Sequence, residues 1–339
     1  MEKTKWGIMG AGLLADDCFA PALLKAKNAE LLSVYCRSKD KAQLFGEKYN
    51  IPSIHWSKEE FLKNPELDIV YISTPNAHHY EDVIAAANAG KNIFCEKPVA
   101  LNSEEAIDMK SICDEHNVSL GIAFMFPFHP LSISAREQIQ SGKIGKPRIM
   151  MANFIFDLPW KEKINPWRFN PSLSGGGVII EVGCHCINIL DHLSGLKIKV
   201  ISAVADNKRN IPPSESTGVL TLTYEDGSTG IVTVANNIPA GPYGTCFRIY
   251  GTEGCLIGKG NLSRNPSGRL SCYNKAGKEE IISLPDVTAY TLYIREIESF
   301  SKSIIDRNEY VFNIQYGIEH MKVIDSAYKS IETGQRIFI

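Results

Sequence analysis

Two charged residues, Glu96 and Lys97, end the apolar stretch at residues 93–95 and are followed at once by Pro98. Proline has no amide hydrogen to donate and cannot continue a central strand. One interpretation is a solvated loop at the end of a strand. The other is a charge delivered to a site, where a lysine stabilises negative charge that develops on oxygen or passes a proton to it.

A second pair of reactive side chains lies in the second half of the chain. Glu181 and His185 are four residues apart in a stretch with helical character, so both side chains are expected on one helix face. A carboxylate beside an imidazole can fix its tautomer and raise its basicity, as a general base near neutral pH requires. The alternative is a core histidine beside a surface glutamate.

No metal site is predicted in this part of the chain. Cys184, His185 and Cys186 are adjacent, and no second pair of ligands follows at a spacing typical of zinc sites.

A glycine-rich motif opens the first helix that the sequence predicts. Residues 10–15 read GAGLLA and fit G-x-G-x-x-A directly after a short apolar strand. Gly10 permits a tight turn, Gly12 lets the backbone approach a pyrophosphate, and the amides at Leu13 and Leu14 begin the helix that faces it. The alternative is a tight turn without a ligand, but the position in a strand–helix unit favours a dinucleotide site.

The end of the second predicted strand favours NADP over NAD. An NAD site usually carries an acidic residue there for the ribose 2′-hydroxyl, whereas this chain has Arg37 and Ser38 and no acid before Asp40. A guanidinium can bind a 2′-phosphate and stack on adenine. Lys39 and Lys41 add positive charge. The alternative for Arg37 is a solvated loop arginine.

Three further strand ends are predicted to face the same crevice, because ligands of open α/β sheets lie beyond the carboxyl ends of the strands. They are STPNAHH at 73–79, CEKP at 95–98 and FMFPFHP at 124–130. We therefore expect Lys97 beside the nicotinamide, with Glu96 supporting it near the ribose. The cofactor contacts predicted from the third strand's end are Thr74, Pro75, Asn76 and His79.

The order of predicted elements indicates an α/β protein with two domains. Strands alternate with helices up to about residue 125, which is typical of a doubly wound parallel sheet of Rossmann type. Afterwards consecutive strands joined by hairpin turns such as EDGS predict an open, mainly antiparallel sheet in a second α/β domain. We assign residues 1–125 to dinucleotide binding and 126–339 to substrate binding and oligomerisation, with the last helix able to pack back on the first domain.

Composition gives no indication of a nucleic-acid or membrane partner. The 339 residues carry a formal net charge of −2, which gives no reason to expect nucleic acid or an acidic membrane surface. No stretch reaches the roughly 18 apolar residues of a membrane span, and no signal-peptide pattern is present. The nine cysteines are scattered without a C-x-x-C. Reduced thiols and a cytoplasmic location are expected.

Five segments, taken in order, carry a family resemblance: GAGLLA, STPNAHH, CEKPVAL, NPWRFNPSLSGGG and EVGCHCIN. They resemble the glucose–fructose oxidoreductase / inositol dehydrogenase / MocA (Gfo/Idh/MocA) family over nearly the whole chain. The resemblance implies hydride exchange between a nicotinamide and a secondary alcohol or ketone, usually on a sugar, inositol or diol. It also implies a homodimer or homotetramer formed through the C-terminal sheet.

The resemblance also implies roles for individual residues. Lys97 matches the family's catalytic lysine, Glu181 falls at its aspartate, and His185 falls at its histidine, or at the tyrosine of some branches. Trp167 and Arg168 match a W-R pair that approaches the cofactor. The segment GCHCIN is closest to the dihydrodiol and xylose dehydrogenase branch, which usually has tyrosine at the position of His185.

Two departures from the family pattern concern the site. Glu181 is one methylene longer than the usual aspartate, and Pro127 stands where many relatives have arginine.

These expectations combine into one mechanism. In the oxidation direction His185 takes the hydroxyl proton, Lys97 stabilises the alkoxide, and Glu181 orients His185. Polar or aromatic loop residues that we expect to contact the substrate are Asp157, Trp160, Asn165 and Tyr243. Two alternatives stay open: a non-catalytic dinucleotide sensor or regulator on the same fold, and an NAD-dependent glycosidase.

Overall fold

The computed structural model describes residues 2–157, 166–206, 214–260, 262–264, 267–284, 287–288 and 290–339. The chain forms two compact units. The first comprises Met1–Met125 and Tyr290–Met321, and the second comprises Phe126–Ala289 and Lys322–Ile339. The sequence-based division assigned residues 126–339 to the second domain, with the last helix able to pack back on the first. In the structure Tyr290–Met321 lies with the first unit, although it comes after most of the second sheet in the sequence.

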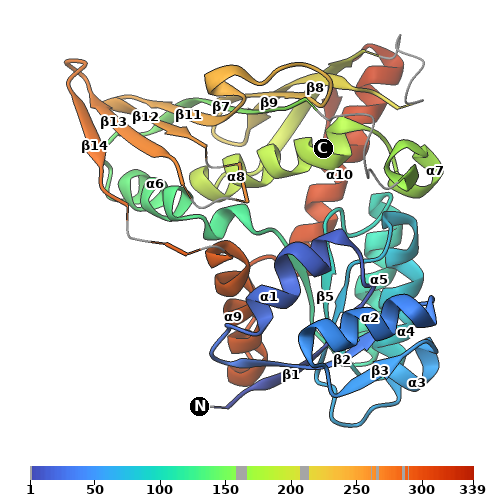
Figure 1. Cartoon of the computed structure of the whole chain (residues 1–339). Coiled ribbons are helices and arrows are strands. Elements are labelled where there is room, and N and C mark those ends of the chain that lie inside the picture. The colour runs from blue at the N-terminus through green and yellow to red at the C-terminus, as the bar shows by residue number, and fades with distance from the viewer. Residues whose placement is uncertain are drawn as a thin grey trace. The chain divides into compact units, whose positions relative to one another are not determined.

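The first unit is built on a six-stranded parallel sheet with the order β3-β2-β1-β4-β5-β6 (Figure 1). The predicted doubly wound parallel sheet is confirmed. In this strand order ligands bind outside the carboxyl ends, where the order reverses, here between β1 and β4. The strands are β1 (Thr4–Met9), β2 (Ala29–Tyr35), β3 (Ser53–His55), β4 (Ile69–Ile72), β5 (Asn92–Glu96) and β6 (Leu120–Ala123).

Helices connect these strands, and several begin at a residue that can cap them. The side chains of Ser38, Ser57 and Asn102 accept a hydrogen bond from the backbone amide three residues later, which satisfies an amide that the helix itself leaves without a partner. The connecting helices are α1 (Ala20–Leu23), α2 (Lys39–Tyr49), α3 (Lys58–Leu62), α4 (His79–Asn88) and α5 (Ser103–Glu115). Helix α9 (Thr291–Asp306) and the part of α10 (Ile314–Thr333) up to Met321 also belong to the first unit, and the rest of α10 belongs to the second.

Trp6 explains why α9 belongs to the first unit. Its ring is fully buried and lies 5.8, 5.7 and 5.9 Å from the rings of Phe19, Phe94 and Phe300. Its indole nitrogen also donates to Ser301 Oγ at 3.1 Å. Burying such large aromatic rings is a dominant source of core stability, so Phe300 is held on β1 and β5 despite its distance along the sequence.

The second unit contains a nine-stranded sheet with the order β14-β13-β12-β11-β7-β10-β9-β8-β15. Among the paired strands of this second sheet that the structure describes, only β7 and β10 pair in parallel. The predicted open, mainly antiparallel sheet is confirmed. The strands are β7 (Pro147–Ile155), β8 (Ile198–Ala205), β9 (Thr217–Tyr224), β10 (Thr229–Ala235), β11 (Thr245–Gly251), β12 (Gly254–Lys259), β13 (Arg269–Asn274), β14 (Glu279–Ile282) and β15 (Ile337–Phe338).

The two faces of this sheet differ. Helices α6 (Pro130–Gln140) and α8 (Cys184–Ser194) run along one face (Figure 1), which we call the helix-covered face. Side chains alternate between faces along each strand. The outer face carries several exposed apolar residues, namely Ile149, Val204, Val219, Tyr250 and Ile281. A short helix, α7 (Pro171–Ser174), precedes α8.

No stretch of membrane-spanning length was predicted from the sequence, but the helical stretch Pro171–Ser194 is long and apolar enough to span a membrane by length and composition, with a mean hydropathy of 1.5 over its most apolar window. However, 83% of that window is buried inside the fold. This is the burial expected of a core helix.

Candidate functional site

The loop after β1 has a backbone conformation that requires glycine. Gly10 has a φ of +106°, and a Cβ there would lie 3.0 Å from the carbonyl carbon of Ser73. Its amide donates to the carbonyl of Tyr35 at 2.9 Å, and Ser73 Oγ donates to the Gly10 carbonyl at 2.7 Å. The loop is thus tied to the ends of β2 and β4, on either side of β1.

The next turn of this loop leaves room for a ligand. A Cβ on Gly12 would meet no atom closer than 3.9 Å, so its backbone is open to approach. Ala15 is fully buried and starts a π-helical turn, Ala15–Phe19, a rare conformation that is frequent at functional sites. The acidic Asp16 is paired with Lys48 Nζ at 2.7 Å, which offsets its charge near the helix start. These residues fit a dinucleotide pyrophosphate.

The end of β2 carries the cation predicted to select the cofactor. Arg37 is exposed. Ser38 begins α2, and its Oγ accepts from the amide of Lys41 at 3.4 Å. Lys39 turns toward the neighbouring strand and lies 4.6 Å above the ring of Trp56. Arg37 is therefore the better placed of these two cations to meet a phosphate beyond the strand end.

Both ring nitrogens of His79, which the sequence predicted as a cofactor contact, lie at backbone carbonyls of its own chain. Its ring is fully buried, with Nδ1 2.8 Å from the carbonyl of Pro98 and Nε2 2.9 Å from the carbonyl of Thr74. Burial lowers its pKa, against the effect of the two carbonyls. His79 instead ties the loop after β4 to the loop after β5. Thr74 turns its hydroxyl to Asp82 at 2.7 Å, and Asn76 is also buried.

Glu96 points into the first unit. Only 6% of it is exposed. Its Oε1 accepts from the hydroxyl of Tyr71 at 2.7 Å, and its Oε2 accepts from the amide of Lys97 at 3.3 Å. Burial and the charge of Glu96 raise the pKa of Tyr71 well above its usual range, so Tyr71 remains a donor. Glu96 thus holds the backbone that presents Lys97, which is part-buried.

The second unit brings together two of its predicted site residues. Arg168 Nη1 lies 2.6 Å from Glu181 Oε1, and its guanidinium stacks 5.0 Å from the ring of Trp167. A charge-assisted hydrogen bond of this length is among the stronger polar contacts in proteins. The sequence predicted each of these residues at the site but did not predict that Arg168 binds Glu181.

His185 lies at the start of α8, just after a π-helical turn, Ile179–Gly183. It is 3% exposed. Its ring makes edge-to-face contacts with Phe126 at 4.6 Å and Phe154 at 6.3 Å, which restrict its rotation. The sequence did not identify these two aromatic neighbours, although Phe126 lies in the FMFPFHP segment that was predicted to reach the crevice.

Only one of the three predicted substrate contacts between residues 157 and 165 lies among the described residues. Asp157 is exposed and pairs with Asn237 in an isolated bridge at the end of β7. Trp160 and Asn165 lie outside the described residues.

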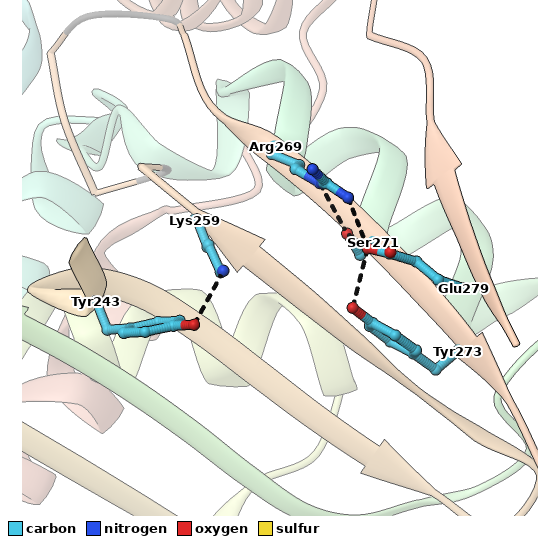
Figure 2. Close-up of polar contacts among 6 residues, drawn as sticks. All are labelled: Tyr243, Lys259, Arg269, Ser271, Tyr273 and Glu279. Atoms are coloured by element: carbon cyan, nitrogen blue, oxygen red, sulfur yellow. Dashed lines mark hydrogen bonds and ion pairs between the residues drawn. The ribbon is translucent and has the colours of Figure 1, made fainter. Parts of the chain in front are cut away.

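Tyr243 lies on the outer face of the sheet, opposite α8 and His185. Figure 2 shows its hydroxyl against Lys259 Nζ, a contact of 3.2 Å. The ring lies 4.3 Å from Lys259 Nζ and 5.6 Å from the guanidinium of Arg248. The β10–β11 connection thus places Tyr243 on the face of the sheet opposite His185, and its contact with the substrate stays a prediction.

A second polar group lies farther along this face (Figure 2). Glu279 Oε1 accepts from Ser271, Arg269 and Tyr273 at 2.7, 2.8 and 2.9 Å. Strand register places these side chains beside one another on β13 and β14. The group fixes the edge of the sheet.

Comparison with known protein families identifies the family to which this chain belongs. Residues 4–124 match the family model described as an oxidoreductase family with an NAD-binding Rossmann fold, and residues 133–257 match the GFO/IDH/MocA C-terminal domain. The chain belongs to the GFO/IDH/MocA family. As a member of this family it is an NAD(P)-dependent oxidoreductase.

Individual GFO/IDH/MocA relatives agree with the branch that GCHCIN indicated. The D-xylose 1-dehydrogenase (NADP(+)) 2 of Haloferax volcanii is 28% identical over 339 residues and covers 98% of both chains. The trans-1,2-dihydrobenzene-1,2-diol dehydrogenase of Mus musculus is 31% identical over 255 residues, covering 74% of this chain and 73% of that protein.

A solved structure supports the fold. The aldose–aldose oxidoreductase from Caulobacter crescentus, complexed with glycerol, has a TM-score of 0.91, 22% identity and coverage of 100% of both chains.

Proposed function

We propose that this protein interconverts a secondary alcohol and a ketone on a sugar, inositol or diol, with Lys97 and His185 handling the proton. One observation carries the proposal most directly. The glycine loop after β1 and Lys97 after β5 lie at the same carboxyl edge of one parallel sheet, which is where ligands of such sheets bind. The names of the xylose and dihydrodiol dehydrogenases support a substrate of this class.

In the proposed mechanism the nicotinamide, when bound, exchanges a hydride with the carbinol carbon. The chain's own residues manage the oxygen and its proton. Lys97 Nζ donates to the substrate oxygen and stabilises negative charge that develops there. A ring nitrogen of His185 takes the hydroxyl proton in oxidation and returns it in reduction. Glu181, held by Arg168, fixes the electrostatic environment at the start of the helix that carries His185.

A substrate screen tests this function. Sugars, inositols, diols and keto-sugars are offered with NADP and NAD in parallel, and absorbance of the reduced nicotinamide is followed. Turnover on at least one polyol or keto-sugar is expected. Cofactor binding without any turnover would instead favour a sensor or regulator, and glycoside hydrolysis without net nicotinamide reduction would favour a glycosidase.

We further propose that NADP is preferred, because Arg37 is exposed at the end of β2. Arg37→Ala is expected to raise KM for NADP by roughly 10- to 100-fold, since a hydrogen bond to a charged group contributes about 1.5–3 kcal/mol. KM for NAD, which lacks the phosphate, should change little. Lys27→Ala, an exposed cation before the start of β2, is the control. An equal rise of KM for both cofactors would contradict the preference.

The outer face of the second sheet is the proposed homodimer or homotetramer interface. Val204 and Val219 are cross-strand neighbours there, and their exposed fractions are 67% and 40%, respectively. Changing both to lysine is expected to shift the protein to monomers in light scattering, because charge would replace apolar contact area. Leu44→Lys, at a position on α2 that is 68% exposed, is the control. An unchanged mass of the double variant would exclude this interface.

No nucleic acid or membrane partner is proposed, and the cytoplasmic location stays a proposal. The near-neutral charge and the burial of Pro171–Ser194 support both statements.

A further inference from the structure

A buried carboxylate from a distant loop closes the start of the helix that carries His185. Glu215 is 7% exposed and lies just before β9. Its two oxygens accept from the amide of Gly177 at 3.0 Å each, and Oε1 also accepts from the amide of Ile179 at 3.1 Å. Its backbone carbonyl accepts from Val178 at 3.0 Å. Three successive amides at the helix start, which a helix leaves without partners, are thus held by one residue.

Tyr328 on α10 completes this arrangement. Its hydroxyl donates to Glu215 Oε1 at 2.8 Å. Burial, together with the charge of Glu215, raises the pKa of Tyr328 well above its usual range, which keeps it a donor. Burial also raises the pKa of Glu215, while the hydrogen bonds from Tyr328, Ile179 and Gly177 act against that rise. The positive end of the helix dipole further favours a carboxylate at this position.

The glycines that precede the helix make room for both side chains. A Cβ on Gly177 would lie 2.0 Å from the carbonyl oxygen of Glu215, and a Cβ on Gly176 would lie 2.1 Å from the hydroxyl of Tyr328. Gly176 also has a φ of +155°. The second and third residues of the GGG motif are therefore required for this contact, which we call the Glu215 clamp: Gly176, Gly177, Glu215 and Tyr328.

The Glu215 clamp is directly connected to the proposed proton-handling residues. The amide of Glu181 donates to the carbonyl of Gly177 at 3.0 Å, so the backbone that Glu215 holds also sets the position of Glu181. His185 follows one helical turn later. Displacements of about 1 Å in a catalytic group can lower a rate about 100-fold, so a loosened helix start would affect chemistry more than substrate affinity.

We propose that Glu215 and Tyr328 are positioning residues that set the placement of Glu181 and His185, an inference that rests on the function proposed above. Their sequence positions carry no motif that predicts this role. Glu215 lies 36 to 38 positions from the amides that it binds, and Tyr328 lies 113 positions from Glu215.

The test compares Glu215→Gln and Tyr328→Phe with the matched control Glu225→Gln, whose Oε1 accepts from the amide of Lys197 at an exposed site. Hydrogen–deuterium exchange of the amides at residues 177–185 is measured first, because it needs no substrate. Glu215→Gln is expected to raise exchange there at least roughly tenfold, Tyr328→Phe by less, and the control not at all.

Kinetics then distinguish positioning from general stability. With a substrate from the screen, Glu215→Gln is expected to lower kcat roughly 10- to 100-fold with little change in KM, and to shift the pH profile of kcat. Unchanged exchange would overturn the clamp, whatever the activity of the wild-type protein. Faster exchange with an unaltered kcat and pH profile would overturn the positioning role. If Glu215→Gln does not fold, Tyr328→Phe decides by the same measurements, since it removes one hydrogen bond only.

Discussion

Lys97→Met is expected to lower kcat by roughly 100- to 10,000-fold, the range typical of losing a group that acts on the proton and charge of the reacting oxygen. Methionine keeps the length and apolar stem of lysine but removes the ammonium. Cofactor affinity should stay near the wild-type value, because the glycine loop that fits the pyrophosphate is held by Tyr35 and Ser73 and does not depend on Lys97.

The measurement is steady-state turnover with a substrate from the screen, combined with fluorescence titration of NADPH. Lys63→Met is the control, because Lys63 is an exposed lysine on the surface of the same unit, with 71% of its side chain accessible. Near-normal turnover in Lys97→Met, with cofactor bound, would rule out the assigned role. A comparable loss in Lys63→Met would show that the assay reports folding rather than chemistry.

Replacing His320 with phenylalanine is expected to make the protein more resistant to acid. His320 is 4% exposed and packs against the rings of Phe124 at 5.1 Å and Tyr316 at 5.7 Å. Neither ring nitrogen has a hydrogen-bond partner among the described residues. Burial lowers the pKa of His320 from 6.5 to about 3, so the ring stays neutral in the folded protein at moderate acidity.

The direction of this pH effect on the free energy of unfolding follows from proton binding. Below about pH 6.5 the unfolded chain binds a proton at this residue, whereas the folded chain does not until about pH 3. The unfolded state is therefore favoured as the pH falls through this window. At pH 5, about 1.5 units below the unfolded pKa, the loss in unfolding free energy is about 2 kcal/mol.

Urea unfolding at pH 7.5, 6 and 5 measures this effect. The difference in unfolding free energy between His320→Phe and wild type should grow in favour of the variant as the pH falls. Burial and Arg136 lower the pKa of His192 to about 4, so some acid sensitivity will remain. His116→Phe, at an exposed position, is the control. A pH-independent difference for His320→Phe would contradict the prediction.

Local sequence patterns were sufficient to predict the first sheet and its glycine loop. Strands such as β4 and β5 are short apolar runs bounded by helices, and GAGLLA directly follows the apolar run of β1. Each signal lies within a few residues and depends on backbone geometry that only certain residue types allow, such as the φ of +106° at Gly10. The family of the chain could likewise be inferred from segments in sequence order.

Side-chain direction and long-range partners could not be inferred in this way. His79 was expected to face a cofactor, yet its ring is buried between the carbonyls of Thr74 and Pro98. Tyr243 was expected at the substrate, yet it lies on the outer face, because the face that a loop residue reaches depends on how the strands around it pair.

The sequence by itself determined that a dinucleotide fold presents Lys97 at a strand end and that a helix carries Glu181 and His185. Tertiary structure alone decided that Phe300 packs on Trp6, that Arg168 binds Glu181, and that Glu215 closes the helix start. The physical reason is common to all three. In each contact the two partners come from segments that no repeating sequence pattern links. Their geometry therefore exists only once both segments are folded.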